Sequence, residues 1–567
     1  MKESDEGVYS KNGATGKSVA GSGVHMSARY LIMSQVYGGL IMCLISLSGC
    51  SWQPVNPCPV AGPLVVRVTA DRPEARYLNC EKATFTIEVT FEGRPATRGE
   101  VEVWLSKDGG PVGTEKKRFD LALQNPIHVV GAVDEPAFFL CQAWATVDPL
   151  RAYGEKMVWY RAPVNPALVT IDLVPDRAEA LYHCGEPATF TARVLQNGEP
   201  VTDGQLELCL SRDGDDLTLT KEIFDLAGSK PLKISGTLHE AAFLYCKARL
   251  TRNSDKNHPV SEWISVGYDV EKIVPETILP KDFEAFWKDT LAKARQLPEN
   301  VELQKIEELS NSKATYYRFG INTLNQERVY GFLGVPCGPG PFPALVLFPG
   351  AGQGAGMPWD IGLTAPGAIT LTMNVHKYPV TELPAEAKKQ METYNAQHHV
   401  SNYVQAGISS RETYHFYAVL AGFCRALDYV CARGDWDRKH LVLMGGSQGG
   451  FLSLAIGSLY ADKVSSAVAE VPYLCDYRRS HRTSDLASLE TMAYYDPVNF
   501  ARFLRCPFRL SVSFVDGSCP PVTVSGAYNA IPRKDKNIMM EPRAGHGVTP
   551  DRQAMGRDYV LRGLGFQ

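Results

Sequence analysis

Between residues 64 and 270, polar and apolar residues alternate over short runs, which is the pattern of half-buried β-strands. The clearest runs are residues 84–91, 100–103 and 205–208. Glycine-containing turn signals such as Asp108-Gly109-Gly110 and Asn197-Gly198 separate them. A unit of about 100 residues with several short strands is typical of an immunoglobulin-like β-sandwich.

This region is a tandem duplication. Five segments recur at an offset of 105 residues. They are 71–77 and 176–182, 83–86 and 188–191, 105–109 and 210–214, 119–122 and 224–227, and 135–138 and 240–243. We therefore predict two tandem β-sandwich domains, residues 64–163 and 164–270. Their default interpretation is a spacer or packing module, because no aromatic platform for carbohydrate is identifiable.

Each unit contains a candidate disulfide, Cys80–Cys141 in the first and Cys184–Cys246 in the second. Cys141 and Cys246 are equivalent at the offset of 105, whereas Cys80 and Cys184 are one residue out of step. In strands, one residue reverses the direction of a side chain. The spacing therefore leaves both disulfides open.

A different pattern begins after a linker, in residues 271–567. Phe283, Phe286, Trp287 and Leu291 fall on one face of a predicted helix. Strand-like runs then alternate with helical stretches such as 413–432. The runs are 314–319, 329–335, 344–348, 368–373, 441–444 and 508–514. The alternation predicts an α/β domain with a doubly wound, mostly parallel sheet.

The clearest chemical motif is Gly445-Gly446-Ser447-Gln448-Gly449, which follows an apolar strand and precedes an apolar helix. This is the context of a nucleophile elbow, where glycines allow the strained turn that exposes a serine hydroxyl. The hydroxyl then lies at a helix N-terminus, which favours negative charge. We predict Ser447 to be a nucleophile.

A serine nucleophile needs a base, and the base needs an acid to orient it. Only His481 and His546 follow Ser447, and His546 is favoured because it lies in a glycine-flanked loop rather than a charged one. Asp516 directly follows the strand at 508–515 and is the predicted acid, with Asp535 as a weaker rival. A base of this kind works in its neutral form, so activity is expected to fall below about pH 6.5.

An oxyanion hole requires two N–H groups where charge develops. The first is expected from Gln448, directly after the nucleophile. The second is expected from the loop after the strand at 344–348, where Pro349 has no N–H to donate. Ala351 is the predicted donor, with Gly352 as the alternative.

From about residue 280 to the C-terminus, the chain resembles the acetyl xylan esterase and cephalosporin C deacetylase family of α/β-hydrolases. The matching segments are 282–287, 445–450, 471–479, 516–523 and 527–529. The resemblance implies a catalytic triad of Ser447, Asp516 and His546, with oxyanion donors at Ala351 and Gln448. It also implies hydrolysis of acetyl esters on small xylo-oligosaccharides without a metal, and assembly into a homo-oligomer.

The sequence departs from this family at two places. Pro349-Gly350-Ala351 stands where members usually have His-Gly-Tyr, so the tyrosine that lines their acyl pocket is missing. Residues 374–410 also diverge and are expected to reshape the mouth of the pocket. The choice of acyl group is therefore the least constrained part of the resemblance.

The composition of the chain limits the classes of ligand and partner that we expect. The 567 residues have a net charge of -4 and no basic patch interleaved with aromatics, which gives no reason to expect nucleic acid. The 14 cysteines include no C-x-x-C pair and no Cys/His cluster at zinc spacing. We expect no metal and no cofactor.

The N-terminal residues resemble a targeting signal. Residues 1–25 are a polar extension, Met26 is a better start, and residues 30–47 are apolar. The ending Leu47-Ser48-Gly49-Cys50 resembles a bacterial lipobox, which predicts lipidation of Cys50 and a proline-rich tether over 51–63. We therefore expect an exported lipoprotein anchored to a membrane, in the periplasm or at the cell surface.

Together these patterns predict a serine carboxylesterase acting on acetylated saccharides. Two alternatives remain open. A peptidase of the prolyl-oligopeptidase type also has a G-x-S-x-G turn, although its accessory domain is typically a propeller. A glycan-binding lipoprotein with an inactive hydrolase domain is the other, and the complete set of Ser447, Asp516 and His546 argues against it.

Overall fold

The computed structural model describes residues 64–566, except 73–75, 79, 108–109, 112–116, 134–136, 149, 162–168, 216, 229–230, 254–258, 353–366, 399–402 and 482–484. The predicted signal, Cys50 and the tether lie outside the described residues. Among the described helices, none combines the length and apolar character that crossing a bilayer requires.

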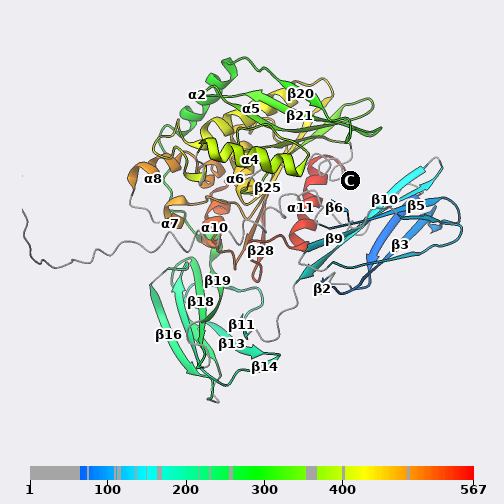
Figure 1. The fold of residues 1–567 in the computed structure, drawn as a ribbon. Coiled ribbons are helices and arrows are strands. Elements are labelled where there is room, and N and C mark those ends of the chain that lie inside the picture. The colour runs from blue at the N-terminus through cyan, green and yellow to red at the C-terminus, as the bar shows by residue number, and fades with distance from the viewer. Residues whose placement is uncertain are drawn as a thin grey trace, which may run out of the picture.

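The first β unit consists of two sheets (Figure 1). One contains β1 (Leu64–Ala70), β3 (Ala83–Phe91), β4 (Arg94–Pro95) and β8 (Ile127–Gly131). The other contains β2 (Arg76–Leu78), β5 (Glu100–Lys107), β6 (Gly110–Pro111), β7 (Lys117–Asp120), β9 (Ala137–Val147) and β10 (Leu150–Arg161). Alternate residues of both sheets, such as Phe85, Ile87 and Val101, are fully buried in one core between them.

The second β unit repeats this arrangement. Its first sheet contains β11 (Val169–Pro175), β13 (Ala188–Gln196), β14 (Glu199–Pro200) and β17 (Lys233–Gly236). Its second contains β12 (Leu181–Tyr182), β15 (Gln205–Arg212), β16 (Thr218–Asp225), β18 (Ala242–Thr251) and β19 (Val260–Tyr268). The duplication extends to details, because Tyr77 and Tyr182 each donate a hydrogen bond to the aspartate six residues earlier.

The two candidate disulfides are not formed in the structure, where Cys80, Cys141, Cys184 and Cys246 are free thiols. Cys141 and Cys246 lie inside the two cores, with no exposed surface. Cys80 and Cys184 instead lie in turns before β3 and β13. The mismatch in their spacing therefore reflects turn positions rather than opposite faces of a strand.

The C-terminal region is built on one sheet of nine strands in the order β20-β21-β22-β24-β23-β25-β26-β27-β28. The first four strands pair antiparallel, and every pair from β24 to β28 is parallel. The strands are β20 (Glu302–Lys305), β21 (Ala314–Asn322), β22 (Arg328–Pro336), β23 (Phe342–Phe348), β24 (Ile369–Met373), β25 (Trp436–Gly446), β26 (Ser466–Glu470), β27 (Phe508–Ser513) and β28 (Lys536–Glu541). The mostly parallel sheet predicted for this region is confirmed.

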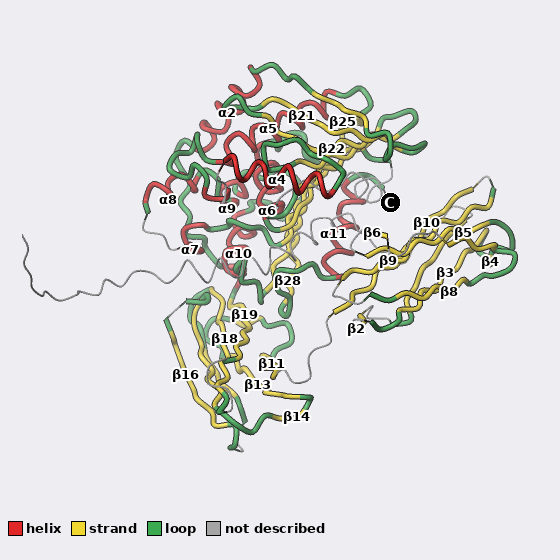
Figure 2. Tube along the Cα trace, in the orientation of Figure 1, coloured by secondary structure: helices red, strands yellow, loops and turns green. Residues whose placement is uncertain are grey.

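Helices cover both faces of this sheet (Figure 2). Leu345, Val442 and Val468 face α11 (Pro550–Gly563), and the alternate residues Val346 and Leu443 face the opposite helices. The other helical segments are η1 (Val270–Lys272), α2 (Phe283–Gln296), α4 (Pro384–His398), η2 (Tyr403–Gln405), α5 (His415–Ala432), α6 (Gln448–Leu459), α7 (Tyr477–His481), α8 (Leu486–Ala493), α9 (Pro497–Ala501) and α10 (Pro521–Ala530). The doubly wound arrangement is that of an α/β-hydrolase.

The predicted apolar face of α2 is confirmed, because Phe283, Phe286, Trp287 and Leu291 are all buried. Trp287 also donates its indole N–H to the carbonyl of Tyr494 at 3.0 Å. This core is continuous with the core of the second β unit, so the two regions share one buried cluster.

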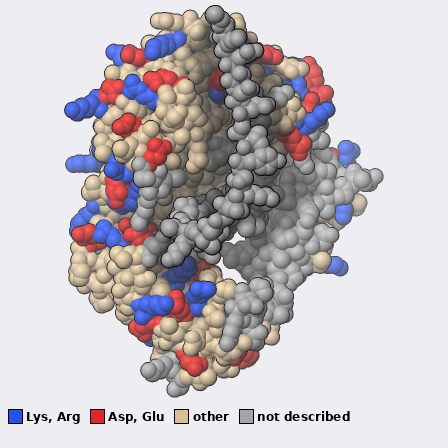
Figure 3. Space-filling view, turned by 60° about the vertical axis from the view of Figure 1, so that its left-hand side comes forward, with Lys and Arg blue, Asp and Glu red and all other residues tan. Residues whose placement is uncertain are grey.

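Charged side chains of both signs are interspersed over the surface. On the face shown in Figure 3, lysine and arginine alternate with aspartate and glutamate over the described part of the chain. That distribution agrees with the small net charge of the sequence.

Candidate active site

Ser447 lies between β25 and α6 with φ of 55° and ψ of −119°, a conformation that side chains rarely adopt. A Cβ added to Gly445 would lie 2.5 Å from the backbone of Gly449, and one added to Gly449 would lie 2.4 Å from the carbonyl oxygen of Phe348. Only glycine fits at these two positions. The turn is held further by the Ser447 amide, which donates to the carbonyl of Glu470 at 2.8 Å.

The structure brings the three predicted residues together from three carboxyl-terminal loops. The Nε2 atom of His546 lies 3.0 Å from the Ser447 hydroxyl, and its Nδ1 atom lies 2.8 Å from a carboxylate oxygen of Asp516. A neutral imidazole that donates from Nδ1 to Asp516 presents a bare Nε2 to the serine proton. The set can therefore take a proton from Ser447 and stabilise the imidazolium that results.

Asp516 is completely buried at the end of β27. Its second carboxylate oxygen accepts hydrogen bonds from the backbone amides of Ser518 and Cys519, both at 2.8 Å. Both oxygens are thus occupied, and the carboxylate is fixed in orientation. The rival Asp535 instead pairs with Arg533 at the surface, and His481 is the last residue of α7.

The oxyanion loop after β23 is tied to the elbow by the side chain of Gln448. Its amide group donates to the carbonyl of Gly350 at 2.9 Å. The backbone N–H of Gly352 donates to the Tyr403 hydroxyl at 3.4 Å, which favours Ala351 over Gly352 as a free donor. The Gln448 backbone N–H is the first of α6, where a helix offers it no internal partner.

Two further residues at this loop were not identified from the sequence. The Tyr403 hydroxyl donates to the side-chain oxygen of Gln448 at 2.6 Å, and His376 Nε2 donates to the carbonyl of Gly352 at 2.7 Å. Burial lowers the pKa of His376, so it stays neutral. Both belong to the divergent stretch 374–410, and Tyr403 brings an aromatic hydroxyl to the loop whose own tyrosine is missing. No spacing pattern pointed to either residue.

Asp516, Cys519 and His546 place possible metal-ligand atoms within 4.8 Å of one another. Both nitrogens of His546 already lie against Ser447 and Asp516. Burial raises the pKa of the Cys519 thiol well above its usual value, which disfavours the thiolate that a metal requires. The donor set fits a hydrogen-bonded triad better than a metal site.

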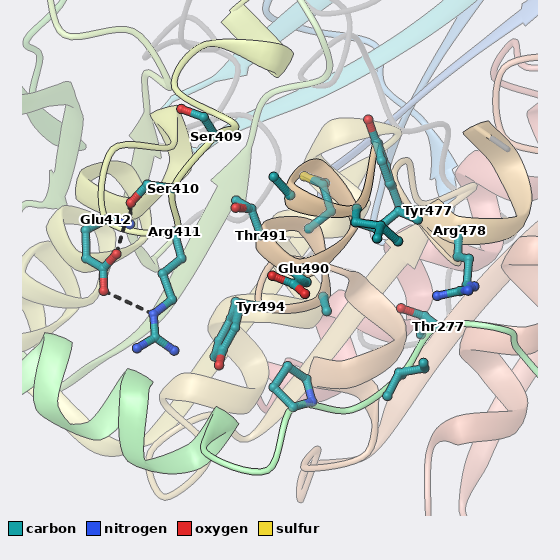
Figure 4. Close-up of a pocket in the computed structure, with 17 residues that line it drawn as sticks. Thr277, Ser409, Ser410, Arg411, Glu412, Tyr477, Arg478, Glu490, Thr491 and Tyr494 are labelled. Atoms are coloured by element: carbon teal, nitrogen blue, oxygen red, sulfur yellow. Dashed lines mark hydrogen bonds and ion pairs between the residues drawn. The ribbon is translucent and has the colours of Figure 1, made fainter. Parts of the chain in front are cut away.

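A pocket of about 620 Å³ lies elsewhere in this domain, between the linker, the segment before α5, and α8 (Figure 4). None of the residues of the predicted triad lines it. Of its charged residues, Arg411 is paired, because it contacts Glu412 at 3.0 Å and Asp282 outside the pocket at 2.8 Å. We therefore place no catalytic step there.

Comparisons with known proteins show the family to which the chain belongs. The family model for acetyl xylan esterase (AXE1) matches residues 268–488 and 480–557. Acetyl esterase Axe7A from Xylanibacter ruminicola is 31% identical over 395 residues, which span 67% of this chain and 87% of that protein. The chain belongs to the acetyl xylan esterase family. It is therefore a carboxylic ester hydrolase.

Among solved structures, an acetyl xylan esterase from Paenibacillus sp. R4 is 23% identical with a TM-score of 0.45. It spans 52% of this esterase and 98% of its own chain. Acetyl xylan esterase 1 from Thermoanaerobacterium sp. JW/SL YS485 is 22% identical with a TM-score of 0.46, over 52% of this chain and 97% of its own.

A buried carboxyl group beneath the elbow makes the stability of the esterase dependent on pH. Glu470 ends β26, and one of its carboxylate oxygens has no hydrogen-bond partner among the described residues. Burial raises its pKa to about 7. The folded state therefore holds a proton that an unfolded chain has already released, and stability is lost as pH rises toward 7.

Replacing Glu470 with glutamine should remove this dependence. We expect E470Q and the wild type to have the same free energy of unfolding below about pH 4.5. As the pH rises to about 7, E470Q should become more stable than the wild type by as much as about 3 kcal/mol. Chemical denaturation followed by fluorescence across this range measures the difference. If the unfolding free energies of the two proteins changed with pH in the same way, the raised pKa of Glu470 would be contradicted.

Proposed function

We propose that residues 271–567 remove acetyl groups from acetylated hemicellulose-type saccharides through a Ser–His–Asp acyl-enzyme mechanism. The observation that carries this proposal is the continuous chain of hydrogen bonds from Ser447 through His546 to Asp516. Membership of the acetyl xylan esterase family supports the choice of ester and substrate.

In the acylation step, His546 accepts the proton of Ser447 as the serine oxygen attacks the ester carbonyl. Asp516 holds the imidazole in the required tautomer and stabilises its positive form. The backbone amides of Ala351 and Gln448 stabilise the negative oxygen of the tetrahedral intermediate, aided by the N-terminus of α6. His546 then gives its proton to the sugar hydroxyl that leaves.

In the deacylation step, water takes the position of the sugar alcohol. His546 removes a proton from this water, which attacks the acetyl-serine and forms a second tetrahedral intermediate. Collapse of that intermediate releases acetate and returns the proton to Ser447. One acetyl group leaves per turnover, and no redox step is involved.

No observation favours the alternative functions. The two accessory units are β-sheet units rather than a propeller, which gives no support to a peptidase of the prolyl-oligopeptidase type. A glycan-binding protein with an inactive domain would have no need for a complete, hydrogen-bonded triad. We keep the esterase as the single proposal.

For the rest of the chain, we propose an exported lipoprotein anchored through Cys50, in the periplasm or at the cell surface. The lipobox-like ending at residues 47–50 supports this proposal. We propose that the two β units are immunoglobulin-like, on the basis of their paired sheets and size. Assembly into a homo-oligomer is proposed from the family resemblance alone.

A substrate panel tests the proposed function. Purified protein is given acetylated xylo-oligosaccharides, acetylated cephalosporin, and aryl esters of acetate, butyrate and octanoate, and acid release is measured. We expect acetyl esters to have kcat/KM at least about tenfold above that of the octanoate ester, because one added methylene in a fitted pocket already costs about 1–3 kcal/mol. Preference for the long acyl ester, or cleavage of proline peptides alone, would contradict the proposal.

A further inference from the structure

The second β unit contacts the loop that carries Asp516. Ser265 of β19 has no exposed surface, and its hydroxyl donates to the carbonyl of Phe514 at 2.6 Å. The Phe514 ring meets Phe243 of β18 edge-on, with ring centres 5.0 Å apart and planes at 80°. Phe514 precedes Asp516 by two residues, so this contact fixes the loop on its N-terminal side.

An aromatic pair from the same sheet lies on the other side of Asp516. Tyr245 and Trp263 stack at 5.1 Å with nearly parallel planes. A ring carbon of Trp263 lies 3.7 Å from the position that a Cβ on Gly517 would take. Phe514, two residues before the acid, and Gly517, directly after it, are therefore both covered by β18 and β19. In Figure 1 these strands lie directly below α10 and β28.

The same contacts extend to the loop of His546. The amide of Val515 donates to the carbonyl of Ala544 at 3.0 Å, so the two loops are joined. At the surface, Arg543 pairs with Asp172 of β11 at 3.2 Å. The second β unit thus touches both loops that hold the proton-transfer partners of Ser447.

The first β unit provides an internal comparison. At the offset of 105, Leu140 stands where the second unit has Tyr245. In the strand registers, Leu140 pairs with Met157 as Tyr245 pairs with Ser265, and Glu155 takes the position of Trp263. Core residues such as Tyr77 and Tyr182, or Phe85 and Phe190, are the same in the two copies, but this outer face differs between them. The copy with tyrosine and tryptophan at these positions is the one that contacts the Asp516 loop.

The length of the match to acetyl esterase Axe7A also supports a link between the esterase domain and the region before it. The match to acetyl esterase Axe7A covers 67% of this chain, which is more than residues 271–567 contain. It must therefore extend into the region before residue 271. That relative matches a continuous stretch joining the esterase domain to a preceding segment.

We propose that the second β unit is part of the catalytic apparatus, with Ser265 as a positioning residue that acts through Asp516. Small displacements of an orienting carboxylate misplace the imidazole it holds, and catalysis is sensitive to errors below 1 Å. This proposal rests on the triad proposed above. It assigns the β unit a role in the rate of the chemical step rather than in spacing or sugar binding.

The test is a double-mutant cycle between S265A and D516N, measured on an aryl acetate. S265A alone leaves the Phe514 carbonyl without its donor, and we expect kcat to fall about tenfold with KM changed less than twofold. D516N alone should lower kcat by about 10⁴. In the D516N background, adding S265A should change kcat less than twofold, because Asp516 no longer orients the imidazole.

Val266→Ala is the matched control. Val266 neighbours Ser265 in β19, is equally buried, and faces the interior of the β unit. V266A should lower the melting temperature while kcat stays within twofold of the wild type. If S265A proves too unstable to purify, W263L replaces it, because Trp263 is only half-buried and also touches the acid loop.

Each possible result either supports or overturns the positioning role of Ser265. Unchanged kcat in S265A, or equal losses in the wild-type and D516N backgrounds, overturns the positioning role. A loss of kcat in V266A as large as in S265A would do the same, since general destabilisation would then explain both. Full activity in D516N would instead overturn the triad itself, so the two failures are distinguishable.

Discussion

Replacing Ser447 with alanine should lower kcat/KM on acetyl esters by at least about 10⁴-fold, the largest effect expected of any single change in this esterase. The variant lacks the atom that forms the proposed acyl intermediate, while the proposed oxyanion donors at Ala351 and Gln448 remain. Only the catalysis that these donors provide should persist. Steady-state kinetics on an aryl acetate, with mass spectrometry to detect the acetylated serine, measures both consequences.

Ser453→Ala serves as the control for this variant. Ser453 lies in α6, the helix that directly follows Ser447. It is fully buried, and its hydroxyl has no hydrogen-bond partner among the described residues. Its removal should leave kcat/KM within twofold of the wild type. If S447A kept more than a few per cent of the activity, another residue would have to be the nucleophile.

The second large effect concerns Arg552, which lies beneath the loop of His546 with its side chain only 2% exposed. It donates to Glu541 at 2.6 Å and to the carbonyl of Gly547 at 3.0 Å, and it also contacts Ser513. Replacing Arg552 with methionine leaves Glu541 buried without its partner. We expect R552M to lose about 3–5 kcal/mol of unfolding free energy in chemical denaturation.

The double variant R552M/E541Q separates the charge from the packing. Neutralising Glu541 removes the unpaired charge, so the double variant should recover more than half of the stability that R552M loses. A double variant as unstable as R552M would show that packing of the arginine stem, rather than charge, is what matters.

The sequence predicted those parts of the site that depend on local chemistry. Gly445 and Gly449 indicated the elbow, because a side chain at Gly445 would collide with α6 and one at Gly449 with the end of β23. Asp516 could be selected because parallel strands end at one edge of a sheet, and His546 because it lies in one of only two histidine-containing loops after Ser447 and that loop is flanked by glycines. The helix at Phe283 was visible because its buried side follows the helical period.

Other parts could not be found from local patterns. Tyr403 and His376 reach the oxyanion loop from a stretch with no strand or helix signal linking them to Gly352. The contact between Ser265 and Phe514 joins residues 249 apart in the chain. A polar residue in an alternating strand reads as solvent-facing, and only tertiary packing shows that its partner is another domain. The cysteine spacing could not decide the two disulfides for a related reason, since it cannot distinguish a turn from a strand.

The second β unit and the α/β domain share one buried core. This shared core limits how far the chain can be shortened from its N-terminal side. Phe514 has no exposed surface, and it would meet water if the chain began near residue 271 and lacked Phe243 and Ser265. A truncated protein starting there would expose an apolar patch beside its own acid loop and should aggregate or unfold readily. The minimal cooperative unit of this esterase is expected to start at β11, so the α/β domain should not be expressed without the second copy of the repeat.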